Sequence, residues 1–169
     1  MHKAYKEYIW KNGKPYGKNL TQDLAGTTYQ IIVDPYYKRF SLEAFKDGKF
    51  DTLIYDSYLF DFRYLKRPEH AQWRREYLSE TAALIRDEVD RLILKEVYTF
   101  KNDLCIRTDI YTPRELLVAS QKIFYKQLND PFNGVALFDI AGKKVMQKTY
   151  EWDETTNAFS DLIEESWET

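Results

Sequence analysis

The second half of the chain is a succession of short segments typical of β-strands, and this pattern constrains the fold more than any other feature. The segments are rich in aliphatic, β-branched and aromatic residues, and they are 83–87, 91–100, 104–111, 116–126, 134–140 and 143–152. The separators between them are short and carry charged or turn-forming residues such as Asp, Asn, Pro and Gly. Because connections of this length join antiparallel neighbours, the sequence predicts a β-meander.

The first half of the chain shows a weaker pattern of the same kind. A short buried strand is predicted at 28–34 and a hairpin at 39–56, where Asp47 and Gly48 can supply the positive φ angles of a tight primed turn. Turn-forming residues dominate the preceding segment, so we expect residues 1–27 to be an irregular or weakly stranded lead-in.

The stretch "DSYLFDFRYL" at 56–65 carries an aromatic ring at every second position. The rings belong to Tyr58, Phe60, Phe62 and Tyr64. An alternation with period 2 places them on one face of a strand, and we expect that face to be covered. Arg63 then lies on the opposite face. If the rings faced a hollow instead, they would form the wall of a ligand cavity.

Two segments carry helical rather than strand-like patterns. Pro68 suits the first turn of a helix, and Trp73 and Tyr77 are spaced i, i+4, which predicts a short helix near 68–78. In the C-terminal segment, apolar residues lie at i, i+3, i+4 and i+8, namely Phe159, Leu162, Ile163 and Trp167. This spacing predicts an amphipathic helix at 157–167.

Composition and length complete the predicted fold. Aromatic residues make up 17% of the 169-residue chain, with 14 Tyr and 10 Phe, and both types favour strands. A chain of this length suits one ordinary domain. We therefore predict a single mainly β domain over 1–169, in which an antiparallel meander of about ten strands spans 28–152 as a curled sheet or a closed barrel.

Charge and motif content argue against several classes of function. The 25 Lys and Arg residues oppose 27 Asp and Glu residues without a long basic run, so we expect neither nucleic acid nor a membrane as a partner. The start has no uninterrupted apolar segment, which favours a cytoplasmic protein. One Cys and two His leave no recognisable metal site, and no cofactor is expected. No nucleophile or phosphate-binding motif occurs, so the sequence favours a protein that is not an enzyme; a dispersed catalytic site would leave no linear signature.

The single cysteine lies in the predicted strand 104–111. Simple alternation places Cys105 on the same side as Arg107 and Asp109. A guanidinium beside a thiol would lower the pKa of the thiol and make it reactive, but a small residue on a half-exposed sheet face is the favoured interpretation.

Candidate binding residues come from the aromatic segments. Tyr36 and Tyr37 lie at the turn after "VDP", where two adjacent rings cannot both enter one core, so at least one is expected to be exposed. Exposed Tyr is common in protein-recognition surfaces. The candidate residues for binding a partner or ligand are Tyr36, Tyr37, Tyr58, Phe60, Phe62, Arg63 and Tyr64.

Two functions fit this sequence. The first is a non-enzymatic interaction protein whose sheet face presents Tyr, Arg and Lys to a protein partner. The alternative is a carrier of a small hydrophobic ligand, because the strand number and length resemble those of lipocalin-like or fatty-acid-binding-protein-like barrels. A large enclosed cavity would favour the carrier. Uncovered sheet edges would also allow a homodimer.

Overall fold

A computed structural model describes residues 2–66, 72–126 and 133–169 of the chain. Its contacts divide the chain into two compact units: unit 1 consists of Met1–Lys66 with Glu168–Thr169, and unit 2 consists of Arg67–Trp167. Strands dominate both units, so the prediction of a mainly β protein is confirmed. Whether the two units act as one domain, as the sequence predicts, stays a prediction.

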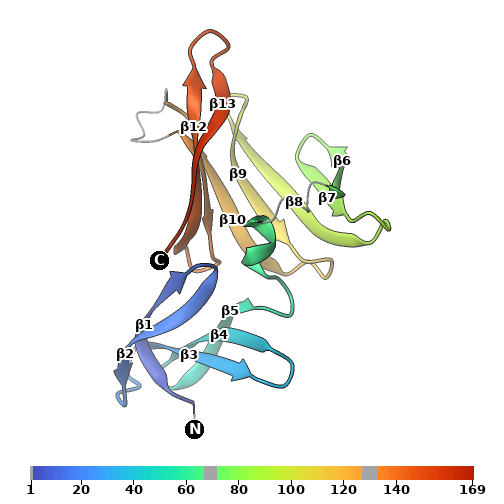
Figure 1. The fold of residues 1–169 in the computed structure, drawn as a ribbon. Helices are drawn as coiled ribbons and strands as arrows, with labels where there is room; N and C mark the ends of the chain where they lie inside the picture. Colours follow the sequence, from blue (N-terminus) through green and yellow to red (C-terminus); the bar gives the residue numbers. More distant parts are fainter. Residues whose placement is uncertain (1, 67–71, 127–132) are drawn as a thin grey trace. The chain divides into compact units, whose positions relative to one another are not determined.

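Unit 1 contains one antiparallel sheet (Figure 1). Its strands are β1 (Ala4–Lys11), β2 (Lys14–Thr21), β3 (Thr27–Asp34), β4 (Arg39–Lys46) and β5 (Lys49–Asp56), in the order β2-β1-β3-β4-β5. The prediction of an irregular lead-in over 1–27 is wrong. Asn12 and Gly13 both have positive φ angles, 52° and 79°, and they form a tight turn that pairs β1 with β2.

The hairpin predicted at 39–56 is confirmed as β4 and β5. Asp47 and Gly48 have φ angles of 49° and 76°, as the predicted turn requires. The Asp47 carboxylate also accepts a hydrogen bond of 2.8 Å from the Gly26 N–H, which fixes the turn beside the start of β3.

An aromatic cluster forms the core of unit 1. The ring of Trp10 meets those of Tyr55 and Phe62 edge to face at 5.2 and 5.1 Å, and Tyr55 stacks on Phe62 at 5.1 Å. Tyr8, which is fully buried, extends the cluster from β1. Edge-to-face and offset pairs of this kind stabilise a core beyond the area that they bury.

The strand predicted over 57–65 is wrong. After β5 the chain turns, because the N–H groups of Leu59 and Phe60 both donate to the carbonyl of Asp56. A short 3₁₀ helix, η1 (Phe62–Lys66), follows. The rings therefore do not share a face. Phe60 and Phe62 are buried in the core, whereas Tyr58 is 79% exposed.

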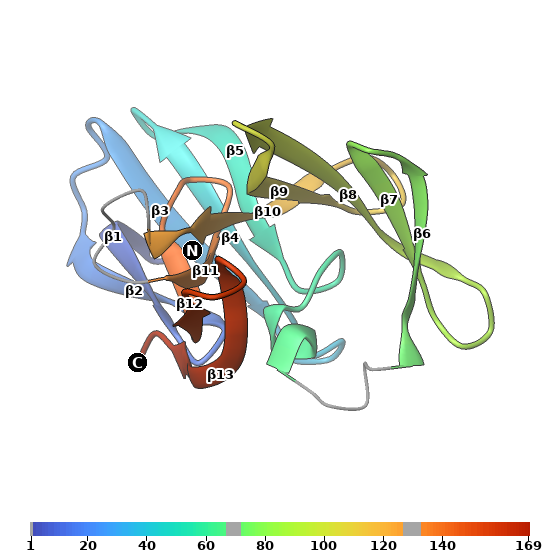
Figure 2. The same cartoon turned by 90° about the horizontal axis from the view of Figure 1, so that it is seen from above.

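Unit 2 contains a second antiparallel sheet in which each strand pairs with its sequence neighbours (Figures 1 and 2). Its strands are β6 (Arg74–Ser79), β7 (Ala82–Arg86), β8 (Leu92–Lys101), β9 (Leu104–Tyr111), β10 (Leu117–Phe124), β11 (Gly134–Phe138), β12 (Lys144–Asp153) and β13 (Ala158–Trp167). The meander predicted for the second half is confirmed, but the strands of 28–152 divide between two sheets instead of forming one curled sheet. In the described residues, β6 and β13 end this sheet, and neither sheet closes, so the closed barrel is wrong.

Both predicted helices are wrong where the structure describes them. Residues 74–78 of the helix near 68–78 belong to β6, which pairs with β7, while 68–71 lie outside the described residues. The segment 157–167 is almost entirely β13, which pairs with β12. The β12–β13 register shifts on both sides of Tyr150, and such bulges break the period-2 pattern and imitate helical spacing. Within the described residues, no helix has the length and apolar character needed to cross a membrane.

Candidate functional site

Two surfaces, one in each unit, combine several exposed aromatic residues. The first is the tyrosine surface, which we define as Tyr36, Tyr37, Arg39 and Tyr58 at one end of the unit 1 sheet. The second is the sheet groove of unit 2, a hollow lined by side chains of β6, β8 and the turns that follow these strands.

The β3–β4 turn presents two tyrosines of the tyrosine surface. A carboxylate oxygen of Asp34 accepts the backbone N–H groups of Tyr36 and Tyr37 at 3.0 and 3.2 Å, which fixes the turn. The two rings contact each other edge to face with centroids 4.8 Å apart. They are nevertheless 84% and 74% exposed, so the turn holds two large rings in solvent.

Arg39 connects this turn to Tyr58. It pairs with Asp34 across the hairpin, and its guanidinium lies 5.3 Å from the centroid of the Tyr58 ring. Two nitrogens of Arg39 bind the carboxylate of Asp56, with Nε at 3.0 Å from Oδ1. The same carboxylate accepts the N–H of Tyr58 at 2.9 Å. The buried Asp56 thus positions both the ring and the cation.

The positive charge of Arg39 is compensated by the carboxylate of Asp56. Its hydrogen bond to Asp56 raises the pKa of the guanidinium, and the negative charge of that carboxylate raises it further. The Arg39 side chain remains 47% exposed although Asp56 is almost fully buried. The tyrosine surface is therefore an aromatic surface with an anchored, neutralised cation at its base.

The structure separates the candidate residues into distinct environments. Tyr36, Tyr37 and Tyr58 are held at one end of the sheet, and Phe60 and Phe62 belong to the core. Arg63 forms an ion pair with Asp61, which also fixes the start of η1 by accepting the Arg63 N–H. Tyr64 is 46% exposed, and its N–H donates to the Asp61 carbonyl.

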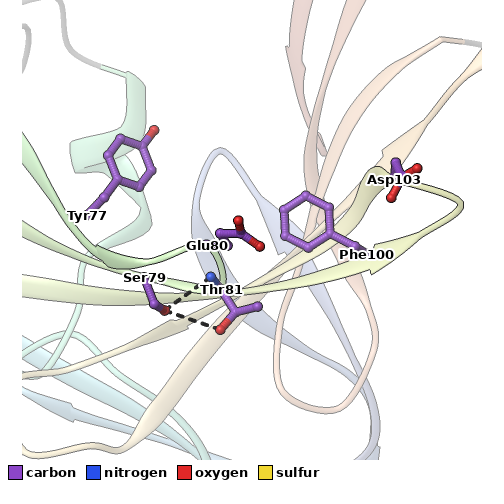
Figure 3. Close-up of a pocket in the computed structure, with 6 residues that line it drawn as sticks. All are labelled: Tyr77, Ser79, Glu80, Thr81, Phe100 and Asp103. Carbon is purple, nitrogen blue, oxygen red and sulfur yellow. Dashed lines mark hydrogen bonds between the residues drawn. The ribbon is translucent and has the colours of Figure 1, made fainter.

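The sheet groove has a volume of about 760 Å³ and is open to solvent. Its lining, drawn in Figure 3, consists of Tyr77, Ser79, Glu80, Thr81, Phe100 and Asp103. The hydroxyl of Ser79 accepts the Thr81 N–H at 3.2 Å, and the Thr81 carbonyl accepts the Tyr98 N–H at 2.8 Å. These bonds fix the β6–β7 turn, and with it Glu80, against β8.

A smaller hollow of about 320 Å³ adjoins the sheet groove and shares Tyr77, Glu80 and Phe100 with it. It crosses the same face of the sheet towards β9 and β10. Its polar contacts centre on Glu96. The carboxylate of Glu96 accepts two hydrogen bonds from Arg75, at 3.1 and 3.2 Å, and another from the Tyr98 hydroxyl.

The titration of these groups reflects that network. Burial raises the pKa of Tyr98. The carboxylate of Glu96, which accepts a hydrogen bond from the Tyr98 hydroxyl, raises this pKa further. The hydrogen bond to Glu96 likewise raises the pKa of Arg75. Arg75 therefore stays charged and Tyr98 stays neutral at ordinary pH. The positive charge of Arg75 is compensated by the negative charge of Glu96.

Cys105 also lines the smaller hollow, and this contradicts the predicted side of its strand. The β8–β9 register shifts between Thr99 and Phe100, which leaves Ile106 as an extra residue on β9. With this bulge, the Cys105 sulfur lies 4.0 Å from the Thr108 hydroxyl and 3.5 Å from the Arg107 carbonyl oxygen, and Cys105 and Thr108 line the same hollow. The Arg107 guanidinium binds the carboxylate of Asp109 at 2.8 Å.

The sequence predictions missed the sheet groove. Tyr77 was assigned to a helical face, and Phe100 had no predicted role. A usable signal was the alternation of Glu96, Tyr98 and Phe100 before the turn residues Asn102 and Asp103.

Over the described parts of the chain, no group of three or more His, Cys, Asp or Glu side chains is arranged to hold a metal ion. Both surfaces instead offer exposed ring faces, and the sheet groove adds carboxylates. In comparisons with protein families, curated proteins and solved structures, no match to the chain was found.

Proposed function

We propose that this chain is a non-enzymatic binding protein that engages a protein partner through its tyrosine surface. The observation that carries the proposal is the fixed exposure of three tyrosines, Tyr36, Tyr37 and Tyr58, around one anchored arginine. A folded protein gains little by holding large rings in water, so such an arrangement is typical of a recognition surface.

The backbone contacts of the tyrosine surface support this proposal. The carboxylates of Asp34 and Asp56 hold the turns that carry the rings, so binding would order few additional backbone torsions. Tyrosine also buries a large area for the loss of only two side-chain torsions. A preorganised aromatic surface of this kind can concentrate binding energy in a few residues.

The charge on this surface supports a protein rather than a nucleic-acid partner. Asp56 compensates Arg39, so the surface lacks the excess of positive charge that attracts phosphates. A second copy of the chain is one possible protein partner.

The structure offers less support to a carrier of a hydrophobic ligand. Such a carrier needs an enclosed apolar cavity, and the predicted basis for one was a closed barrel lined by the rings of 58–64. Phe60 and Phe62 instead fill the core of unit 1, and the described hollows of unit 2 are open to solvent.

Site-specific crosslinking in cells that produce the protein tests the proposal. Tyr37 is replaced by a photoreactive phenylalanine analogue, and the crosslinked products are identified by mass spectrometry. Phe50 receives the same analogue as a control, because it is exposed but lies at the opposite end of β5. A defined protein crosslinked from position 37 and not from position 50 is expected.

The partner is then purified and its affinity measured. Substitution of Tyr36, Tyr37 or Tyr58 by Ala should each weaken binding about tenfold, as expected for anchor residues, whereas Phe50→Ala should leave the affinity unchanged. Equal crosslinking from both positions, or tyrosine variants that bind as tightly as the original chain, would refute the proposal.

A further inference from the structure

We infer that the sheet groove of unit 2 is a second binding site, specific for an extended protein segment that carries Lys or Arg side chains. The residues of this site are different from those of the tyrosine surface. Four properties carry it: the exposed rings, the carboxylates beside them, the charge balance of the surrounding arginines and the shape of the hollow.

Two exposed rings line the groove. Tyr77 is 68% and Phe100 is 47% exposed, and they come from β6 and β8. Figure 3 shows Glu80 between the two rings and Asp103 on the far side of Phe100. Each ring therefore lies near a carboxylate, and the faces of aromatic rings also attract cations.

Within the described residues, no ion pair compensates the two carboxylates of the groove. Among the residues that the structure describes, neither Glu80 nor Asp103 forms an ion pair. The arginines on the nearby strands each have another partner: Arg74 binds Asp90, Arg75 binds Glu96 and Arg86 binds Glu76. The groove thus presents two carboxylates together with two rings, and this combination complements a cationic side chain.

The shape of the groove favours an extended segment over an isolated ion. The hollow of about 760 Å³ continues into the smaller one of about 320 Å³, so the surface crosses several strands. At one side lies β6, whose residues are all exposed and which ends the sheet. A terminal strand can pair with an added extended chain, whose alternate side chains would then face the groove.

The adjoining ion pair limits what the groove can accept. Arg75 donates both of its hydrogen bonds to Glu96, so it does not attract an anionic ligand as an unpaired guanidinium would. An acidic segment would meet Glu80 and Asp103 without compensation, at a cost in electrostatic repulsion. The groove should therefore discriminate by the sign of the ligand charge.

Fluorescence polarisation of labelled peptides with the full-length protein tests the inference. The probe is an unstructured peptide in which Arg alternates with Ser. Controls of the same length carry citrulline or Glu in place of Arg. We expect the Arg peptide to bind, with an affinity that falls as salt is raised, and the citrulline and Glu peptides to bind at least tenfold more weakly.

Protein variants locate the binding site. Glu80→Gln combined with Asp103→Asn should weaken binding of the Arg peptide at least tenfold, and Tyr77→Leu should weaken it severalfold. Asn tolerates the positive φ of Asp103, so the turn is retained. Glu88→Gln removes one exposed negative charge from another turn of unit 2 and serves as the matched control.

The tyrosine-surface variant Tyr37→Ala should bind the Arg peptide normally, which separates this inference from the proposed function. Thermal unfolding verifies that each variant is folded. The inference is overturned if the Arg peptide does not bind at low salt, if it binds no better than the citrulline peptide, or if Glu88→Gln weakens binding as much as the groove substitutions.

Discussion

Tyrosine occupies three kinds of position in this protein, and the residue type does not distinguish them. Tyr8 and Tyr55 are buried in the aromatic core, Tyr98 anchors the polar network of the groove face, and Tyr36 and Tyr37 lie in solvent. The backbone decides between these positions. A tyrosine on a strand faces inward or outward by alternation, whereas a tyrosine in a turn held by an aspartate is forced outward.

Tyrosines in different environments should ionise at different pH values. Burial raises the pKa of both Tyr55 and Tyr98 above the ordinary value of 10.0. A group whose pKa is higher in the folded state stabilises the fold below its unfolded pKa, and this contribution is lost as the pH rises through the folded value. Stability should therefore fall above about pH 10.

Ultraviolet absorbance of tyrosinate measures this effect. Some tyrosines of the native protein should ionise only at a pH above the ordinary range, which we call the late phase of the titration. Tyr98→Phe should reduce the amplitude of this late phase. In denaturant, all 14 tyrosines should titrate together. A late phase of unchanged amplitude in Tyr98→Phe would show that the hydroxyl of Tyr98 is not held by burial and Glu96.

At the scale of the element, the strands are specified by their turns and disturbed by their bulges. The β4–β5 hairpin follows directly from Asp47 and Gly48. The β12–β13 pair contains two register shifts, and Phe159 on β13 stacks on Tyr150 of β12 at 5.5 Å and on Tyr125 at 5.2 Å. Tyr125 comes from a distant part of the sequence, and these ring contacts favour a strand where the local spacing is helical.

A single glycine controls another pair of strands. A Cβ atom added to Gly134 would lie 2.0 Å from the backbone carbonyl oxygen of Lys148, and the partner backbone cannot yield without breaking the β11–β12 ladder. We expect Gly134→Ala to lower the free energy of unfolding by about 3 kcal/mol, a large effect for one substitution.

Urea denaturation compares this variant with Lys148→Ala. The control removes the Lys148 side chain and its long ion pair of 3.9 Å with Glu165 but retains the carbonyl oxygen. Its expected effect is below about 1 kcal/mol, because the ion pair is long and both side chains stay partly exposed to solvent. Equal effects of the two substitutions would mean that the close backbone approach at Gly134 is not the cause.

At the scale of the whole molecule, strands account for all the long regular elements in the described residues. The far-ultraviolet circular dichroism spectrum should therefore show the single minimum of a β protein. Trifluoroethanol should increase the helical signal, because alcohols favour local helical preferences such as those of 68–78 and 157–167. A double helical minimum in plain buffer would contradict the assignment of β6 and β13 as strands.

The sequence by itself determined the β class, the antiparallel meander of the second half and the hairpin of 39–56. These features depend on interactions between near neighbours: alternation along a strand and the φ angles available to Asp-Gly in a turn. The same local information was misleading where a bulge or a distant partner intervened. It predicted a helix at 157–167 and four rings on one face at 58–64.

Only the tertiary structure decided the two candidate surfaces. Tyr58 joins Tyr36 and Tyr37 because β5 returns beside β4, so that Asp56 can bind Arg39 from 17 residues away. The groove needs Tyr77 and Phe100 on strands separated by β7. Strand pairing determines which residues become neighbours. Pairing depends on burial and on hydrogen bonds between segments that are far apart in the sequence, so the local sequence does not show these contacts.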